Sequence, residues 1–317
     1  MSEPLIMAVP SKGRLKEQVE AWLADCGLKL SIAGGARGYM AELKGVSGVQ
    51  VRLLSAGDIA EALDAGEVHL GITGEDLLRE RSGVLEDKAL LLRALGFGRA
   101  DLVVAVPKSW IDVDTMADLE DVAHEFLSRT GRRMRVATKY LVQTRGFFAR
   151  HGVADYRIAE SGGATEGAPA AGAAELVVDI TTTGATLVAN GLKIVSDGVI
   201  LKSQAQLTAS LRASWSAEQL AAAEGLLRIV EARALAHESA TLVWPAQDGD
   251  EALVAELIAE GCAPRPHGLL TPVDKVAEAA RKLTAAGRGP VTASRPDFVF
   301  ETHCAPFEAL RDKVQHF

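Results

Sequence analysis

The sequence predicts an α/β protein built from more than one domain. Short apolar runs typical of strands alternate with segments of helical period, which indicates a mainly parallel sheet covered by helices. The pattern restarts after Pro107 and again near Ser239. A chain of 317 residues also exceeds the usual size of a single hydrophobic core. We therefore expect two α/β domains and a small C-terminal α/β unit, with a ferredoxin-like arrangement as one candidate for the third.

The first domain is predicted to comprise residues 1–107 and to regain residues 195–237 later in the chain. Its strands and helices alternate in the order Leu5–Val9, Leu15–Cys26, Val49–Leu54, Ile59–Ala65, Val68–Ile72 and Glu75–Arg81. An apolar strand at Leu102–Val106 completes the first segment. Three later segments are assigned to the same domain: Lys193–Ile200, Gln204–Leu211 and the long helix Ala217–His237.

The second domain is predicted at residues 108–194, where the alternation continues after Pro107. Its expected elements are a helix near Thr115–Arg129, a strand Met134–Thr138, a helix Leu141–His151, a strand Tyr156–Ala159, a short helix near Thr165–Ala171 and a strand Leu176–Ile180. Each strand is followed by a helix, so its carboxyl end should open onto a turn.

The third unit is predicted at residues 239–317. Its expected elements are a strand Ala240–Pro245, helices Glu251–Glu260 and Val273–Ala286, a strand Pro290–Phe300 and a helix Pro306–Val314. Alternating strands and helices of this length can bury a small core of their own.

Composition restricts the partners. The formal net charge of -8 argues against non-specific binding of nucleic acid, which needs a basic surface, but allows a local cationic pocket. No apolar run reaches the roughly 20 residues needed to span a bilayer. The first residues place an acid where a signal peptide has positive charge, and three cysteines lack any C-x-x-C spacing. We expect a cytoplasmic protein without nucleic-acid or membrane partners.

The stretch "DITTTGATL", Asp179–Leu187, follows a buried apolar run, so it lies where a strand gives way to a helix. In α/β folds such turns present free N–H groups to anions. Gly184 lets a ligand approach the backbone, threonine hydroxyls can contact phosphate oxygens, and Asp179 can accept from ribose hydroxyls. An ordinary capped turn is the alternative, because Thr and Gly are common there.

Two stretches of the first domain have a similar design. The segment Leu70–Leu77 runs from a strand through Thr73 and Gly74 to the acids that open a helix, although simple capping preferences also place acids there. The turn "SKGR", Ser11–Arg14, adds two cations near an expected strand end. It predicts either a clamp for pyrophosphate or a solvated basic turn.

Four residues near the C-terminal end could in principle hold zinc: Cys262, His267, His303 and Cys304. Their spacing matches no common ligand pattern, so we assign no metal site to protein side chains.

Several stretches together resemble the ATP phosphoribosyltransferase family, whose members catalyse the first step of histidine biosynthesis. The matching segments are "SKGRL" (11–15), "GEVHLGITGEDLL" (66–78), "ALGFGRADLVVAVP" (94–107), "RVATKY" (135–140) with "TR" (144–145), "SGGATEGAPAAGAAELVVDITTTGATLVANGL" (161–192) and "ILKSQAQL" (200–207). They follow one another in order over most of residues 5–211.

The resemblance implies two periplasmic-binding-protein-like domains with the active site in the cleft between them. It implies transfer of the phosphoribosyl group of phosphoribosyl pyrophosphate (PRPP) to N1 of ATP, with release of pyrophosphate and with Mg²⁺ as cofactor. Negative charge grows on the leaving group and oxocarbenium character on the sugar, so cations and orientation matter more than a strong general base. We assign no residue as general base.

Residue by residue, the resemblance implies a PRPP site and an ATP or pyrophosphate site. The PRPP site would comprise Asp179, Thr182, Thr183, Gly184, Ala185 and Thr186, with Glu160 and Ser161 nearby. The ATP or pyrophosphate site would comprise Lys12, Gly13, Arg14, Thr73, Gly74 and Glu75, with Arg37 and Arg52 as weaker candidates. Two loops depart from the family pattern: Leu-Val-Gln follows Tyr140 where Pro-Asn-Leu is expected, and Ser161–Ala164 replaces a Gly-Ser-Val.

The family has a short form, which depends on a synthetase-like regulatory subunit, and a long form with a C-terminal domain that binds histidine. The length here fits the long form, although the segment "PRPHGLLTPVDKV" only faintly resembles its regulatory domain. L-histidine is therefore a candidate feedback inhibitor, and a homo-oligomer, dimer or hexamer, is expected. Two other classes stay open: a non-catalytic cytoplasmic sensor of small anions on the same fold, and a regulatory paralogue.

Overall fold

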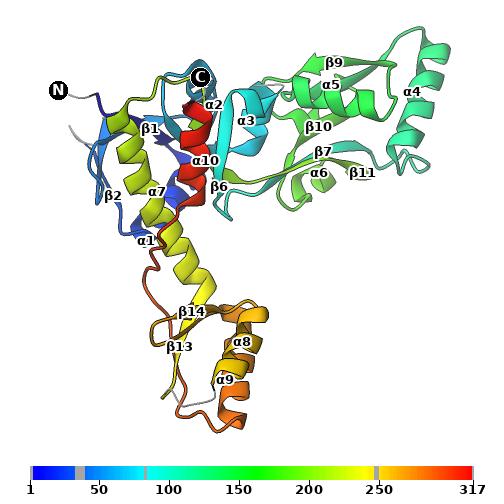
Figure 1. The fold of residues 1–317 in the computed structure, drawn as a ribbon. Coiled ribbons are helices and arrows are strands. Elements are labelled where there is room, and N and C mark those ends of the chain that lie inside the picture. The colour runs from blue at the N-terminus through cyan, green and yellow to red at the C-terminus, as the bar shows by residue number, and fades with distance from the viewer. Residues whose placement is uncertain (1–2, 33–39, 82–83, 246–249, 316–317) are drawn as a thin grey trace.

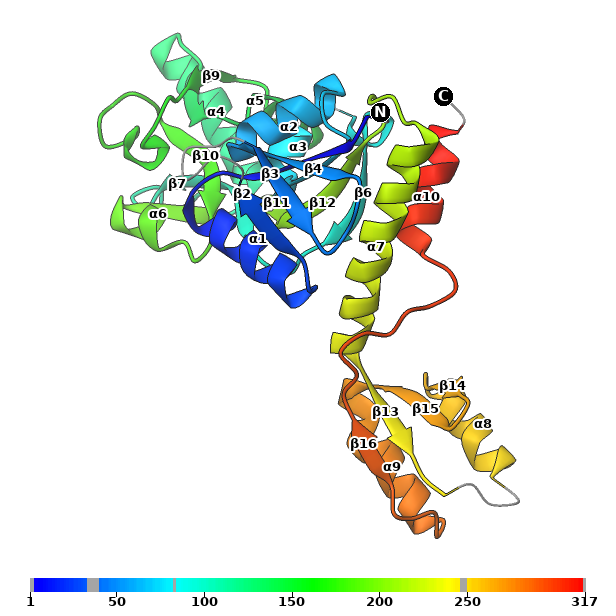
Figure 2. The ribbon, with the colours of Figure 1, turned by 90° about the vertical axis from the view of Figure 1, so that its left-hand side faces the viewer.

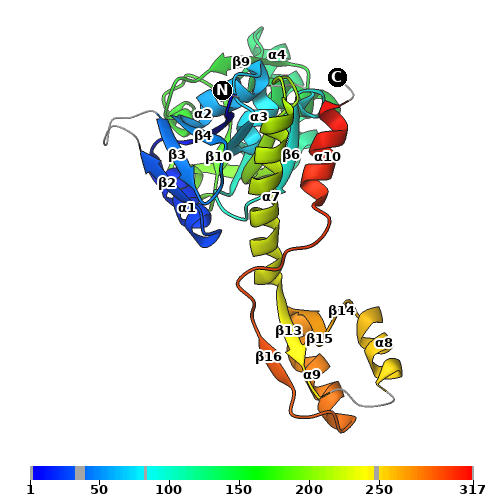
Figure 3. The ribbon, with the colours of Figure 1, turned by 60° about the vertical axis from the view of Figure 1, so that its left-hand side comes forward.

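The computed structural model describes residues 3–32, 40–81, 84–245 and 250–315 (Figure 1). Three sheets organise this part of the chain, with seven, five and four strands. Two α/β units lie side by side (Figure 1), and the third, small unit lies at the end of a long helix (Figures 2 and 3). The predicted fold class, two α/β domains with a small C-terminal α/β domain, is confirmed.

The first unit is built on the seven-stranded sheet, ordered β2-β3-β4-β1-β5-β12-β6. Its strands are β1 (Leu5–Pro10), β2 (Lys29–Ile32), β3 (Met40–Lys44), β4 (Val49–Leu54), β5 (Leu70–Gly74), β6 (Ala89–Ala94) and β12 (Ala205–Ser210). Helices α1 (Gly13–Asp25) and α7 (Ala217–Glu238) bury apolar residues on one face, and α2 (Ala56–Ala65) and α3 (Glu75–Arg81) do so on the other. Helices on both faces explain why its central strands are almost wholly apolar.

The second unit is built on the five-stranded sheet, ordered β11-β7-β10-β8-β9. Its strands are β7 (Ala100–Pro107), β8 (Met134–Thr138), β9 (Tyr156–Glu160), β10 (Leu176–Thr181) and β11 (Leu192–Ser203). Helices α4 (Met116–Thr130) and α5 (Leu141–Arg150) cover one face, and the short α6 (Ala185–Ala189) covers the other. The expected helix near 165–171 is reduced to a 3-10 turn at Thr165–Gly167.

The predicted boundary between these two units is wrong at two strands. β7 and β11, assigned from the sequence mainly to the first domain, pair with each other and β7 with β10, inside the second sheet. The reason is burial on both faces of β7, where Val103 packs in one core and Val104 in the other, and both cores belong to the second unit. Only β12 and α7 of residues 195–237 return wholly to the first unit.

The small unit consists of β13 (Ser239–Val243), α8 (Glu251–Ala259), β14 (Ala263–Arg265), β15 (Gly268–Pro272), α9 (Val276–Ala285) and β16 (Thr292–Ser294). This βαββαβ order with the antiparallel sheet β14-β15-β13-β16 is the ferredoxin-like arrangement. Its own core includes Leu242, Leu257 and Leu283.

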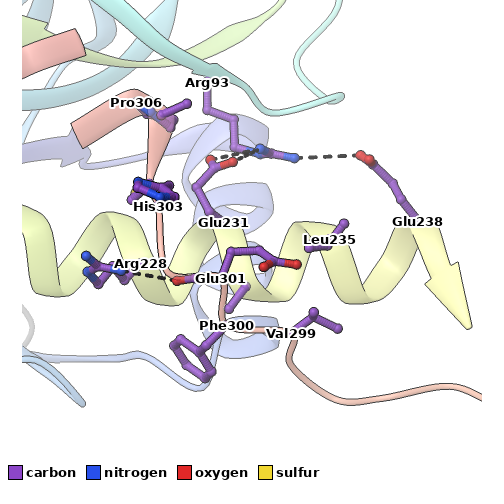
Figure 4. Close-up of a pocket in the computed structure, with 13 residues that line it drawn as sticks. Arg93, Arg228, Glu231, Leu235, Glu238, Val299, Phe300, Glu301, His303 and Pro306 are labelled. Atoms are coloured by element: carbon purple, nitrogen blue, oxygen red, sulfur yellow. Dashed lines mark hydrogen bonds and ion pairs between the residues drawn. The ribbon is translucent and has the colours of Figure 1, made fainter. Parts of the chain in front are cut away.

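The last segment of the chain leaves the small unit and returns to the first, which corrects the assignment of 239–317 to one domain. Helix α10 (Ala305–Val314) lies beside α7 (Figure 2), and its Phe307 and Leu310 are buried in the core of the first unit. On the way, the chain crosses α7, where the Arg228 guanidinium donates to the carbonyl of Glu301 at 3.2 Å (Figure 4) and to that of Thr302 at 3.2 Å.

The pocket between α7 and this returning segment is lined by groups that already have partners. The guanidinium of Arg93 donates to both carboxylate oxygens of Glu231 at 2.7 and 2.8 Å and lies 3.7 Å from Glu238 (Figure 4). We interpret this pocket as part of the contact that holds the segment leaving the small unit against α7.

Candidate active site

Three parallel strands of the first unit, β1, β4 and β5, end at the same edge of the sheet. The N–H of Ser11, just after β1, donates to the carbonyl of Leu54 at the end of β4 at 2.8 Å. The turn with Lys12 and Arg14 therefore lies at the edge where β5 ends at Gly74. Both cations are exposed, and neither forms a hydrogen bond or ion pair with the described residues.

The parallel strands β8, β9 and β10 of the second unit likewise end at a common edge. The threonine-rich turn starts there, and its shape depends on Gly184, whose φ of 76° lies in the left-handed region that favours glycine. The Thr181 hydroxyl accepts from the Gly184 N–H at 2.8 Å, and the Thr183 hydroxyl accepts from the Ala185 N–H at 3.4 Å. Thr182, Thr183 and Thr186 remain exposed.

Asp179 lies at the base of this turn and is half-buried. Burial raises the pKa of its carboxyl above the ordinary value, while the N–H of Ile180, which donates at 2.9 Å, and nearby Lys139 oppose the shift. A carboxylate that water solvates poorly gains from hydroxyl donors or a cation brought by a ligand.

The two edges meet at adjoining pockets between the units. One is lined by Arg14, Leu15, Gln18, Gly96, Phe97, Gly98, Arg99 and Thr182, and the other by Arg99, Ala100, Asp101, Thr181, Thr182, Lys202, Ser203 and Gln204. The Thr182 hydroxyl donates to the carbonyl of Arg99 at 3.3 Å, which ties the threonine-rich turn to the chain crossing before β7. Cations from both units, Arg14, Arg99 and Lys202, thus surround a space beside the threonine-rich turn.

Comparison with known proteins agrees with this arrangement. A family model described as ATP phosphoribosyltransferase matches residues 55–231. The chain belongs to this family. Proteins named ATP phosphoribosyltransferase from Caulobacter vibrioides (strain NA1000 / CB15N) and Bradyrhizobium sp. (strain ORS 278) are 66% and 50% identical to it. The alignments cover 99% and 98% of this chain, and 100% and 98% of the relatives.

A solved structure gives the same result. The chain is similar, with a TM-score of 0.53 and 26% identity, to the "ATP phosphoribosyl transferase (HisG:HisZ) complex from Thermotoga maritima", over 72% of this chain and 98% of that one. Among the described residues of this family member, no helix has the length and hydropathy required to cross a membrane.

Three residues predicted for the ATP or pyrophosphate site have side chains that are already bonded within the first unit. Thr73 is fully buried, and its hydroxyl donates to the carbonyl of Ala56 at 2.7 Å, so it supports α2 instead of offering a free donor. The Glu75 carboxylate accepts from Arg79 at 2.8 Å and from Gln206 at 3.0 Å. Arg52 donates to the carbonyl of Glu67 at 3.5 Å, before β5 begins, which points it away from the edge where β5 ends.

Other predicted residues lie at the second unit's edge or outside the described part. Glu160 ends β9 and is exposed, and the Ser161 hydroxyl donates to the carbonyl of Gly163 at 2.8 Å. Gly13 begins α1 with a φ of 76°. Arg37 lies outside the described residues.

Sequence reasoning missed a buried hydrogen-bond network that joins the two units beside the pockets. The Tyr140 hydroxyl donates to one carboxylate oxygen of Asp76 at 2.8 Å, and the Ser203 hydroxyl donates to the other at 2.7 Å. The side chain of Gln143 donates to the Asp76 carbonyl at 2.9 Å. Gly74 makes room for this carboxylate, because a Cβ there would lie 2.4 Å from Asp76 Oδ1.

Arg99 and Lys202 were missed as well, although both lie in segments quoted for the family resemblance. The signal for Arg99 is the pair of glycines at positions 96 and 98, which both have positive φ and line the same pocket as Arg99. Lys202 directly precedes Ser203, whose hydroxyl donates to Asp76. Its position beside the pocket follows only from the pairing of β11 with β7.

Proposed function

We propose that this chain transfers the phosphoribosyl group of PRPP to N1 of ATP and releases pyrophosphate, the first step of histidine biosynthesis, in the cytoplasm. The observation that supports the proposal best is the meeting of the threonine-rich turn with the cations Arg14, Arg99 and Lys202 between two units of a chain that belongs to the ATP phosphoribosyltransferase family. The hydroxyls and N–H groups of the threonine-rich turn suit a phosphorylated ribose, and the cations suit pyrophosphate.

In this proposal the turn from Asp179 to Thr186 holds the phosphoribosyl group. Its exposed hydroxyls and the N–H groups at the start of α6 contact the 5-phosphate, while Asp179 accepts from the ribose hydroxyls. Lys12 and Arg14 join Arg99 and Lys202 around the leaving pyrophosphate. Because these cations come from both units and surround one space, they would stabilise the negative charge that develops on the leaving group in the transition state.

Adenine N1 is itself a nucleophile, so the protein's task is to align it with C1 of the sugar and to exclude water. Exclusion of water requires the two units to hold their spacing, which the Asp76, Tyr140 and Ser203 network supports. No general base is needed for the bond to form.

The cofactor proposed is Mg²⁺ brought by the substrate. Within the described residues, no group of three or more His, Cys, Asp or Glu side chains is placed to hold a metal. Mg²⁺ commonly binds through one or two carboxylates and substrate phosphates, and Asp101 at the pocket and Asp179 nearby fit that pattern. When bound, Mg²⁺ supplies positive charge to the leaving pyrophosphate.

The test is to mix the full chain with ATP, PRPP and Mg²⁺ and to follow phosphoribosyl-ATP and pyrophosphate. We expect product only when all three are present and none with EDTA. Equal turnover with EDTA would reject the metal role. Tight binding of PRPP without any product would instead favour the non-catalytic sensor or the regulatory paralogue.

We further propose that L-histidine acts through the ferredoxin-like unit and that the chain forms a homo-oligomer, dimer or hexamer. Titration of L-histidine against the full chain should lower activity, and light scattering should give the oligomeric state. A chain cut near His237 is an unsuitable control, because it also removes Phe307 and Leu310 from the first unit's core. An internal deletion of residues 244–294 that keeps α10 should be insensitive to histidine.

A further inference from the structure

Positive charge is concentrated in one part of this acidic chain. Residues 129–157 contain eight Lys or Arg residues and a single acid, Asp155, whereas the whole chain has a net charge of -8. Most of these cations are exposed on the second unit. Neighbouring positive charges repel one another, and a bound anion would relieve this repulsion. The arrangement of the cluster therefore indicates what kind of anion it could bind.

Five of the arginines line one pocket, together with Tyr156. Its lining residues are Arg132, Arg133, Arg135, Arg145, Ala154, Tyr156, Arg157 and Ile158. Arg132 and Arg135 share the carboxylate of Glu175, with their closest contacts at 3.0 and 2.8 Å. The other three guanidinium groups form no hydrogen bond or ion pair with any residue that the structure describes.

The pocket lies apart from the proposed active site. It surrounds the beginnings of β8 and β9 at Met134 and Tyr156, whereas the threonine-rich turn lies at the edge where these strands end. Five residues of strand separate the two edges by roughly 15 Å. ATP and PRPP bound at the proposed active site would leave this pocket free.

Protection of a sheet edge does not account for the cluster. β9 is the edge strand of its sheet, and a charge such as Arg157 on an edge discourages unwanted strand pairing. One or two charges suffice for that purpose. The arginines with unpaired guanidinium groups come from three separate places, namely the loop before β8, helix α5 and strand β9, and all three line one concavity.

We infer that this pocket is a second anion site and that it binds a polyphosphate group. Planar guanidinium groups bind phosphate oxygens in a bidentate manner, and three of them without partners match a compact ligand that carries several negative charges. A single carboxylate would neutralise only one of the three. The inference does not depend on the reaction proposed for the other edge, because its residues take no part there.

The experiment is calorimetric titration of sodium tripolyphosphate into the full chain, without Mg²⁺ and at low salt. The test variant is Arg133→Gln/Arg157→Gln. The matched control is Arg129→Gln/Arg281→Gln, which removes the same charge from exposed positions outside the pocket. We expect two binding events in the wild type and the control, and in the test variant a loss of one event or a decrease in its affinity of at least about tenfold.

Formation of phosphoribosyl-ATP by the test variant, at the wild-type rate, would show that the fold is intact. If the edge-strand variant fails to fold, Arg145→Gln on α5 replaces it. Equal binding by wild type and test variant, or an equal loss in the control, would overturn the inference, as would an oligoglutamate peptide that binds as tightly as tripolyphosphate. Titration with GTP shows whether the ligand is a nucleotide or a free polyphosphate. If GTP binds more tightly than tripolyphosphate and Tyr156→Ala removes the difference, the site recognises a nucleotide. If the two affinities are equal, the site recognises the phosphate chain alone.

Discussion

Replacement of Tyr140 by Phe should weaken the junction between the two α/β units. The hydroxyl donates to the Asp76 carboxylate over 2.8 Å, and both side chains are buried, with 5% and 6% of their surface exposed. Burial, followed by the neighbouring Asp76 charge, raises the pKa of Tyr140 far above its ordinary value, so the hydroxyl remains a donor. A hydrogen bond to a charged group contributes about 1.5–3 kcal/mol, and Tyr140→Phe should lower the free energy of unfolding by that amount.

Urea unfolding followed by circular dichroism measures the change, with Tyr156→Phe as the control. The Tyr156 hydroxyl forms no hydrogen bond with the described residues, and its partly buried ring packs on Phe148 against the same core that contains Tyr140. The control should therefore lose well under 1 kcal/mol. Equal losses in the two variants would refute the argument. We also expect Tyr140→Phe to raise the KM for PRPP, since the junction sets the spacing of the two edges.

Further predictions concern the proposed ribose site and the response to acid. Asp179→Ala and Thr183→Val should each lower kcat/KM by a factor that corresponds to about 2–4 kcal/mol without loss of fold, and a folded Asp179→Ala enzyme of wild-type activity would show the ribose site to be misplaced. Although burial opposes its ionisation, hydrogen bonds from Arg135 and Arg132 lower the pKa of Glu175 to about 2, from 4.5. A lowered pKa stabilises the fold fully above pH 4.5, and this contribution disappears as the pH falls toward 2. Unfolding of Glu175→Gln should therefore depend less on pH across that window than unfolding of the wild type.

The sequence predicts the two strand-end edges well because the signal is local. An apolar run followed by hydroxyls and glycine marks the carboxyl end of a strand, and parallel strands bring such ends together without further information. The turns after β1, β5 and β10 were located in this way. Which edge of which sheet a strand joins is a different question. β7 is apolar on both faces, so its composition fits a central strand of either sheet.

Elements without a strong apolar period were missed for a related reason. β2 and β3 are short antiparallel strands of four and five residues with mixed polar and apolar side chains, and each resembles a loop when taken alone. Helix α10 was predicted correctly as a helix, but its partner was not. Phe307 and Leu310 could fill a core in the small unit as readily as in the first, so the apolar pattern of α10 does not identify the core that it joins.

Two of the three pocket cations, Arg99 and Lys202, lie on or beside the two chain crossings that connect the units. The first crossing, between β6 and β7, contains Arg99, and the second, between β11 and β12, contains Gln204 and follows Lys202. The crossings are bonded to each other, since the Gly96 N–H donates to the side chain of Gln204 at 3.1 Å. Rotation of one unit against the other therefore moves Arg99 and Lys202 relative to Arg14. An anion that contacts all three cations would therefore bind most tightly in the arrangement of the two units that brings them together.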